Sequence, residues 1–195
     1  MRGACLAMLL LGACAAAPAP DLRASLTRAQ IDRATTPLML VEVPARGAQA
    51  TLIPSGQNGG VQSWRTGDNV GLSFDGGVLV GTRGLGDDLM AADVTGTLAA
   101  LAGGPSQQYP RIHSYLDGEN QTQFRAFLCD MAGPVAETVT IFGRAVPTRR
   151  FDETCHSVGL QTANSYRVGA DGTMWTSRQW IGPTLEYLMT ERLAP

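Results

Sequence analysis

Residues 70–83 read VGLSFDGGVLVGTR, and this stretch decides the fold class. Its first half alternates Val, Leu and Phe with small or polar residues, which is the period-two pattern of a half-buried strand. The turn Asp75-Gly76-Gly77 follows, and glycine accepts the positive φ that a tight hairpin turn requires. A strand-like run then returns over 78–83. The stretch therefore predicts an antiparallel β-hairpin.

The same turn signal recurs along the chain. Asp117-Gly118 separates strand-like runs, and Asp171-Gly172 does so again. Asn58-Gly59-Gly60 is a further turn signal, followed by an alternating run over 61–66. Such a series of turns predicts an antiparallel meander. Many short strands in one domain favour an all-β, barrel-like architecture, with a β-sandwich as the alternative.

Two segments favour helix instead. Ser25 or Thr27 is a suitable N-cap for a short helix that runs to about residue 33. Apolar residues between 90 and 101 have helical spacing, although Thr95-Gly96-Thr97 in their middle favours an extended chain. We expect a helical turn there and a strand over 184–193.

Composition bounds the class of protein. The chain has 195 residues, of which 44% are hydrophobic, so it is long enough for one globular domain with its own core. Its 15 basic residues oppose 17 acidic ones, and neither kind forms a block of like charge. Binding to nucleic acid through a basic surface is therefore disfavoured.

The N-terminus indicates export. The start Met1-Arg2 is positively charged, and the uncharged apolar run over 5–13 is shorter than the about 20 residues that a transmembrane helix needs. Leu11-Gly12-Ala13-Cys14 resembles the lipobox of bacterial lipoproteins. The resemblance implies a signal peptide over 1–13 and lipid, including palmitate, on Cys14. An ordinary signal peptide with a chance cysteine is the alternative.

The lipobox also implies a location. By the sorting rule of such lipoproteins, Ala15 directs the protein to the outer membrane, where it faces the periplasm. We expect residues 14–24 to form a lipidated tether, because AAAPAPD at 15–21 resists helix, and residues 25–195 to form a single β domain. More than one acyl chain gives stable anchoring without a transmembrane helix.

The predicted export also suggests a role for each cysteine. Of four cysteines, Cys5 leaves with the signal peptide and Cys14 takes the lipid, so Cys129 and Cys155 remain. In an oxidising periplasm such a pair is expected to form a disulfide. The two histidines are scattered and no zinc-binding spacing is present, so we expect no metal and no cofactor.

Several stretches together resemble one family. They are GVQSWRT at 60–66, LVGTRGLGDDLMAAD at 79–93, FGRAVPTRRFDETC at 142–155 and SRQWIGPTLEY at 177–187. They are similar to the YjbF/GfcB lipoproteins of group 4 capsule and exopolysaccharide operons. The resemblance implies a barrel-like, periplasm-facing lipoprotein of the outer membrane, made beside genes for polysaccharide export. It implies no established enzymatic activity.

Two groups of residues are candidate ligand or partner contacts. Asp87 and Asp88, with Asp93, follow Arg83 and form the densest acidic group in the chain. Either one carboxylate caps a helical turn while Arg83 pairs with another, or the group binds Ca²⁺ or serves catalysis. Adjacent residues of a strand point to opposite faces, which disfavours a catalytic pair at Asp87 and Asp88.

Arg178 and Trp180 form the second group. They share one face of the expected strand, since residues two apart point the same way. An exposed ring beside a guanidinium is a platform for sugar, and it is equally a structural cation–π contact.

Three functions follow as hypotheses. The favoured one is a non-enzymatic accessory of polysaccharide secretion that binds glycan or export proteins. The second is a polysaccharide-modifying enzyme that uses Asp87, Asp88 or Asp93. The third is a carrier whose barrel encloses an apolar ligand.

Overall fold

The computed structural model describes residues 21–194. The predicted signal peptide, Cys14 and the tether up to residue 20 lie outside the described residues. The strands form one 12-stranded sheet in the order β5-β4-β3-β2-β1-β12-β11-β10-β9-β8-β7-β6, and all neighbours are antiparallel. The elements are α1 (Leu22–Ser25), α2 (Arg28–Ile31), β1 (Leu38–Val43), η1 (Pro44–Arg46), β2 (Ala48–Asn58), β3 (Val61–Arg65), β4 (Gly71–Asp75), β5 (Val78–Arg83), β6 (Ala91–Asp93), α3 (Thr95–Leu101), β7 (Tyr109–Leu116), β8 (Thr122–Ile141), β9 (Arg144–Ser157), β10 (Leu160–Val168), β11 (Met174–Gly182) and β12 (Glu186–Ala194).

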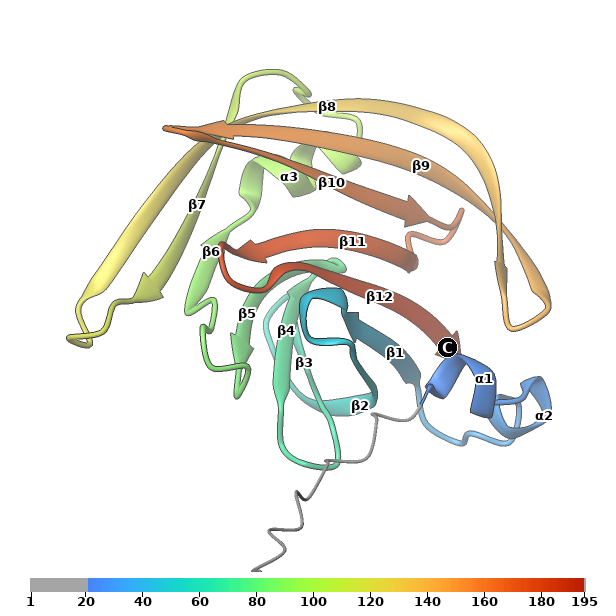
Figure 1. The fold of residues 1–195 in the computed structure, drawn as a ribbon. Coiled ribbons are helices and arrows are strands. Elements are labelled where there is room, and N and C mark those ends of the chain that lie inside the picture. The colour runs from blue at the N-terminus through green and yellow to red at the C-terminus, as the bar shows by residue number, and fades with distance from the viewer. Residues whose placement is uncertain (1–20, 195) are drawn as a thin grey trace, which may run out of the picture.

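The sheet curls into a nearly closed barrel (Figure 1), which confirms the barrel-like prediction. A seam remains between the two ends of the sheet, β5 and β6. Across this seam the backbone N–H of Thr82 donates to the carbonyl of Leu89 at 2.8 Å. Among the residues that the structure describes, no helix is long and apolar enough to cross a bilayer.

The predicted turns are confirmed. Asn58-Gly59-Gly60, Asp75-Gly76-Gly77, Asp117-Gly118 and Asp171-Gly172 join β2 to β3, β4 to β5, β7 to β8 and β10 to β11. Gly77 is needed for two reasons. Its φ is +87°, and a Cβ at this position would lie 2.4 Å from the Cβ of Met174. The β4–β5 turn therefore packs directly against the start of β11.

Strand β1 explains why the run LMLVEV is apolar almost throughout. Met39, Val41 and Val43 pack in the cluster that contains Trp64. Leu38 and Leu40 pack in a second cluster with residues of the N-terminal segment. Both faces of β1 are thus covered, and the strand lacks the apolar–polar alternation of a strand with one wet face.

The N-terminal helices close the outer face of β1 and β12. Thr27 caps α2 as expected, in a capping box with Gln30. Helix α1 overlaps the end of the segment predicted as tether up to residue 24, so regular structure begins before residue 25. The reason is local, because Asp21 caps α1 and Arg23 forms ion pairs with Glu42 and Glu191. Helix α3 confirms the helical turn expected between 90 and 101.

Strands β8 and β9 extend beyond the end of β10 as a two-stranded arm (Figure 1). Their register shifts between Ala132 and Val135. Near the tip of the arm, Ile141 and Val146 pack with Trp175 and Leu193 in a cluster that also contains α2. The arm and the N-terminal helices therefore share a second, smaller core.

Candidate functional site

A cleft of about 310 Å³ opens where the β2–β3, β4–β5 and β10–β11 turns meet, and we call it the end cleft. This volume lies at the lower limit of the roughly 300–1,000 Å³ that small-molecule sites occupy. Its polar lining consists of Gln57, Gln62, Thr173, Thr190 and Arg192. Strands from both ends of the chain thus meet in it.

Arg192 and Trp64 form the charged part of the end cleft. The guanidinium carbon of Arg192 lies 4.6 Å from the centroid of the Trp64 ring, which is buried. The indole N–H of Trp64 donates to Oε1 of Gln62 at 3.1 Å and so fixes the ring. Nε of Arg192 donates to the carbonyl of Ala194 at 3.0 Å. Burial lowers the pKa of Arg192.

The end cleft has the chemistry of a binding site. Amide and hydroxyl groups both donate and accept hydrogen bonds, and a guanidinium donates them, as recognition of sugar hydroxyls and anions requires. None of the described residues that line it is an aspartate or a glutamate. The lining therefore suits a polar ligand, and it offers no carboxylate for acid–base work.

Asp88, a predicted candidate, caps the loop between β5 and β6. Its carboxylate accepts the backbone N–H of Gly84 at 2.8 Å and that of Leu85 at 3.0 Å. The hydroxyl of Thr82 also donates to it, at 2.8 Å. Both carboxylate oxygens are thus occupied. Asp88 therefore holds a loop by accepting hydrogen bonds, and does not cap the helical turn that was expected.

Asp93 lies just before α3, whose N-cap residue is Val94 and has no side-chain cap hydrogen bond. Its carboxylate accepts the backbone N–H of Thr95, the first residue of α3, at 3.0 Å. This hydrogen bond lowers the pKa of Asp93. Asp87 is exposed, and with Asp88 it borders a surface pocket of about 360 Å³ that also includes Tyr115 and Arg125. The three carboxylates therefore serve different local roles.

The expectation that Arg83 pairs with a carboxylate was wrong. Arg83 does not pair with a carboxylate in the described part of the chain, but donates to the carbonyls of Thr82 at 2.6 Å, Leu89 at 3.3 Å and Met90 at 3.3 Å. The physical reason is the seam. Where the β5–β6 ladder is incomplete, backbone carbonyls lack strand partners and a side chain satisfies them.

Arg178 and Trp180 do not form the expected exposed platform. Arg178 lies over the ring of Tyr187, with its guanidinium carbon 3.2 Å from the centroid. Trp180 is only 4% exposed, and its ring stacks on His113 with the centroids 5.7 Å apart. The alternation along β11 ends at Gln179 because the rest of the strand is covered on both faces. The expectation that Trp180 is available for surface contacts was therefore wrong.

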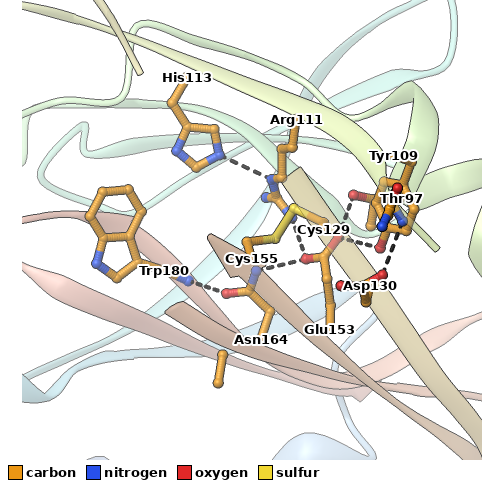
Figure 2. Close-up of a disulfide and its surroundings, with 12 residues drawn as sticks. Thr97, Tyr109, Arg111, His113, Cys129, Asp130, Glu153, Cys155, Asn164 and Trp180 are labelled. Atoms are coloured by element: carbon orange, nitrogen blue, oxygen red, sulfur yellow. Dashed lines mark hydrogen bonds and ion pairs between the residues drawn. A yellow bond between two sulfur atoms is a disulfide. The ribbon is translucent and has the colours of Figure 1, made fainter. Parts of the chain in front are cut away.

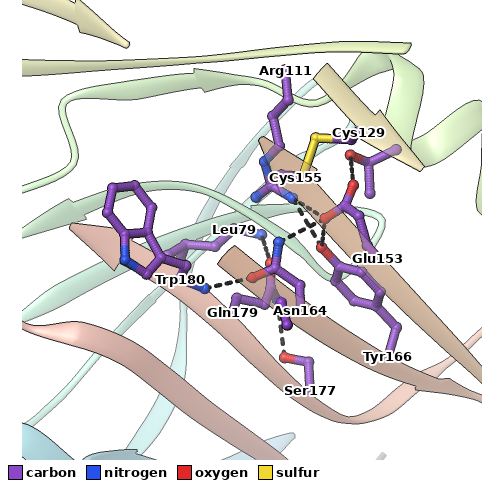
Figure 3. A network of polar contacts seen from close by, with 12 residues as sticks. Leu79, Arg111, Cys129, Glu153, Cys155, Asn164, Tyr166, Ser177, Gln179 and Trp180 are labelled. Atoms are coloured by element: carbon purple, nitrogen blue, oxygen red, sulfur yellow. Dashed lines mark hydrogen bonds and ion pairs between the residues drawn. A yellow bond between two sulfur atoms is a disulfide. The ribbon is translucent and has the colours of Figure 1, made fainter. Parts of the chain in front are cut away.

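A buried polar network surrounds Glu153, which is fully buried (Figure 3). Its carboxylate accepts five hydrogen bonds, from Thr97, Tyr109, Arg111, Asn164 and Tyr166. Burial raises the pKa of the carboxyl group, but the charge of Arg111 and these donors outweigh it, so the pKa of Glu153 is lowered. Glu153 is thus an ionised structural group without a free acceptor site.

The network continues through His113 to a cluster of aromatic rings formed by Tyr115, Phe127 and Trp180. Nε of Arg111 donates to Nε2 of His113 at 3.0 Å, so this ring nitrogen is the acceptor. Nδ1 then donates to the hydroxyl of Tyr115 at 2.9 Å, and that hydroxyl donates to the carbonyl of Ile181 at 3.1 Å. Burial and the charge of Arg111 hold the pKa of His113 well below its ordinary value.

The predicted disulfide is confirmed. Cys129 and Cys155 lie opposite each other on β8 and β9 and are bonded with an S–S distance of 2.02 Å. Figure 2 shows the bond beside Glu153 and Arg111. Both cysteines are buried, so the bond is part of the core.

The barrel interior is filled at its middle. Gln179 accepts the backbone N–H of Leu79 at 2.8 Å and donates to Gly77 and Ser177, which links β5 and β11 across the barrel (Figure 3). A mainly apolar pocket beside Val41 and Leu188 measures about 150 Å³. This is smaller than the roughly 300–1,000 Å³ typical of ligand sites, which disfavours the carrier hypothesis.

Comparisons with known proteins agree with this architecture. The family model described as "Group 4 capsule polysaccharide lipoprotein gfcB, YjbF" matches residues 13–193. The crystal structure of the hypothetical lipoprotein YmcC from Escherichia coli (K12) is similar, with a TM-score of 0.76, 22% identity, and coverage of 89% of this chain and 94% of that one. At this identity the likeness shows the fold alone. No curated protein matches the sequence significantly.

Proposed function

The chain belongs to the family of group 4 capsule polysaccharide lipoproteins, and from this premise we propose that it is a lipid-anchored accessory of capsule or exopolysaccharide secretion. It acts by binding polysaccharide in the end cleft, without catalysing a reaction on the polymer. The observation that carries the proposal is the polar, carboxylate-free lining of the end cleft around Arg192.

Anchoring explains how a weak binding site serves export. The sequence Leu11-Gly12-Ala13-Cys14 supports lipidation at Cys14, and Ala15 supports sorting to the outer membrane. A protein held at the periplasmic face of this membrane meets a nascent polymer at high effective concentration. A polysaccharide repeats the same sugar units, so one polymer chain offers many equivalent binding sites. A low affinity for each single unit is then sufficient for binding the polymer.

The non-enzymatic role is supported by the acidic residues. Asp88 and Asp93 accept backbone hydrogen bonds, which gives both of them a structural role. Asp87 is exposed at a surface pocket and remains the residue on which the enzyme alternative depends. Export proteins are alternative partners, and they would be met at the same location.

The proposal is tested in cells and with purified protein. Deletion of the gene should leave polymer in the periplasm, with unchanged linkages, when polymer is quantified in cytoplasm, periplasm and medium. The full chain carrying Cys14→Ser, purified as a soluble protein, should bind the polymer that the source organism exports. Altered linkage chemistry in the deletion strain, or no binding of that polymer, would overturn the proposal.

A further inference from the structure

We infer that the end cleft recognises the carboxylate of an acidic sugar, which binds to Arg192, with Trp64 as the positioning residue. This inference rests on the proposed function and names the ligand class of the same site. Arg192 is the sole charged side chain among the described residues that line the cleft.

Among the described residues, Arg192 is a partly buried arginine that forms no ion pair, as are Arg125 and Arg178, but it alone of these three lines the end cleft. The fully buried Arg111 and the partly buried Arg167, by contrast, each form an ion pair with a carboxylate. Within residues 21–194, Arg192 has no carboxylate partner, and its one hydrogen bond runs from Nε to Ala194. Removing a cation from water without a counter-charge is unfavourable, so an anionic ligand would stabilise this site.

The stack on Trp64 directs the donors of Arg192. An aromatic ring contacts the face of a guanidinium and leaves the N–H groups at its edge available. Those edge donors match the two oxygens of a carboxylate in a bidentate contact. Because Gln62 holds the indole N–H, the ring on which Arg192 rests is itself fixed. The cleft thus offers an oriented donor group.

The rest of the cleft suits sugar hydroxyls. Gln57 and Thr190 line the same cleft. The amide nitrogen of Gln57 donates to the carbonyl of Gly59 at 3.1 Å, which leaves its amide oxygen for a ligand, and the Thr190 hydroxyl hydrogen-bonds to Ser177 at 2.6 Å. Two carboxylates belong to the turns at its rim, Asp75 and Asp171, and neither forms an ion pair with Arg192. Asp171 is engaged by two hydrogen bonds from Thr173. A volume of about 310 Å³ limits the ligand to a short stretch of sugar units.

The test compares two ligands that differ only in charge. One is an oligogalacturonate of defined length, and the other is the same oligosaccharide with its carboxyl groups reduced to alcohols. In calorimetric titration of the full chain carrying Cys14→Ser, the acidic form should bind at least about tenfold more tightly than the reduced form, as expected for a charge-assisted contact. The preference should decrease as salt is added.

Variants then assign the preference to Arg192. Arg192→Gln should abolish it, and Arg192→Lys should retain part of it because the charge remains. Arg178→Gln is the matched control, since Arg178 also stacks on an aromatic ring but lies outside the cleft. Near-ultraviolet circular dichroism checks that each variant is folded.

The outcomes separate this inference from the proposed function. Equal binding of both oligosaccharides, or a preference that survives in folded Arg192→Gln, overturns the inference and leaves glycan binding intact. If neither oligosaccharide binds while the native polymer does, the inference fails alone. If the native polymer is not bound either, both fail. Should Arg192→Gln not fold, the ligand pair decides the question without that variant.

Discussion

Nη1 of Arg111 lies 2.8 Å from Oε2 of Glu153, and both side chains are buried in the barrel. The two residues belong to β7 and β9, which are not neighbours in the sheet because β8 lies between them. The ion pair therefore links β7 and β9 across the buried face of β8.

Glu153→Gln should destabilise the protein by about 3–5 kcal/mol, because it leaves the charge of Arg111 buried without a partner. Urea unfolding measures the loss. Glu137→Gln is the control, since Glu137 pairs with Arg167 at 3.2 Å in a partly exposed position. Such a pair contributes about 1 kcal/mol or less. Equal losses in the two variants would contradict the structural role of the buried pair.

The stability of the protein should fall as pH falls below 6.5, the ordinary pKa of a histidine. The pKa of His113 is lowered in the folded state by burial and by Arg111, so below pH 6.5 the unfolded chain binds a proton that the folded protein does not. The free energy of unfolding then decreases by up to about 1.4 kcal/mol per pH unit until the folded pKa is reached.

His113→Gln should remove this dependence on pH, and unfolding in urea at several pH values is the measurement. His156→Gln, at an exposed position on β9, is the control and should leave the pH profile as it is. An unchanged profile in His113→Gln would show that His113 is not the group responsible.

Removal of the disulfide should cost about 3 kcal/mol, because the bond closes a loop of 26 residues in the unfolded chain. The variant with Cys129→Ala and Cys155→Ala should show this loss in urea unfolding without reductant. The parent protein should show a similar loss when dithiothreitol is added. A double variant as stable as the oxidised parent would contradict the prediction.

Asp88→Asn should lower the free energy of unfolding by about 1 kcal/mol, as the loss of a cap typically does. Hydrogen exchange should quicken at the Leu89 and Thr82 amides, which belong to the β5–β6 seam. Asp87→Asn is the matched control at the adjacent exposed position, and it should change neither quantity. Polymer linkages should stay as they are in both variants. A change in linkage without a loss of stability would favour the enzyme alternative.

Cys14→Ser should abolish incorporation of labelled palmitate and release the protein into the soluble fraction. The cause is loss of the thiol that carries the lipid. Fractionation with radiolabelling measures both effects. A parent protein that is already soluble and unlabelled would contradict the proposed anchoring.

Local features of the sequence predicted most of the fold. The Asp-Gly and Gly-Gly turns act over a few residues, and glycine at positive φ is required there whatever lies around it. Thr27 and Gln30 likewise form a capping box within one turn of helix. The disulfide was predictable because the predicted export and lipidation leave Cys129 and Cys155 as one pair of cysteines.

The end cleft and the buried network were not predictable in this way. Trp64 and Arg192 lie on strands far apart in the chain, and only closure of the barrel brings them together. Glu153 and Arg111 look like surface charges in their strands, since no sequence pattern marks a partner two strands away. Trp180 was misplaced because alternation fails where both faces of a strand are covered.

Strands β1 and β12 form the only neighbouring pair in the described sheet that is not consecutive in the chain. The other neighbours are consecutive in the chain, and most of them join through short turns, although helix α3 lies between β6 and β7. We therefore expect the two meanders, β1–β5 and β6–β12, to assemble from local contacts. The β1–β12 pair forms only when residues near 40 meet residues near 190. Closing such a long loop of chain has a high entropic cost. We therefore expect this pairing to be the slow step of folding. A chain that lacks residues 186–194 leaves the edges of β1 and β11 without a partner strand, and open edges of this kind can pair with other chains.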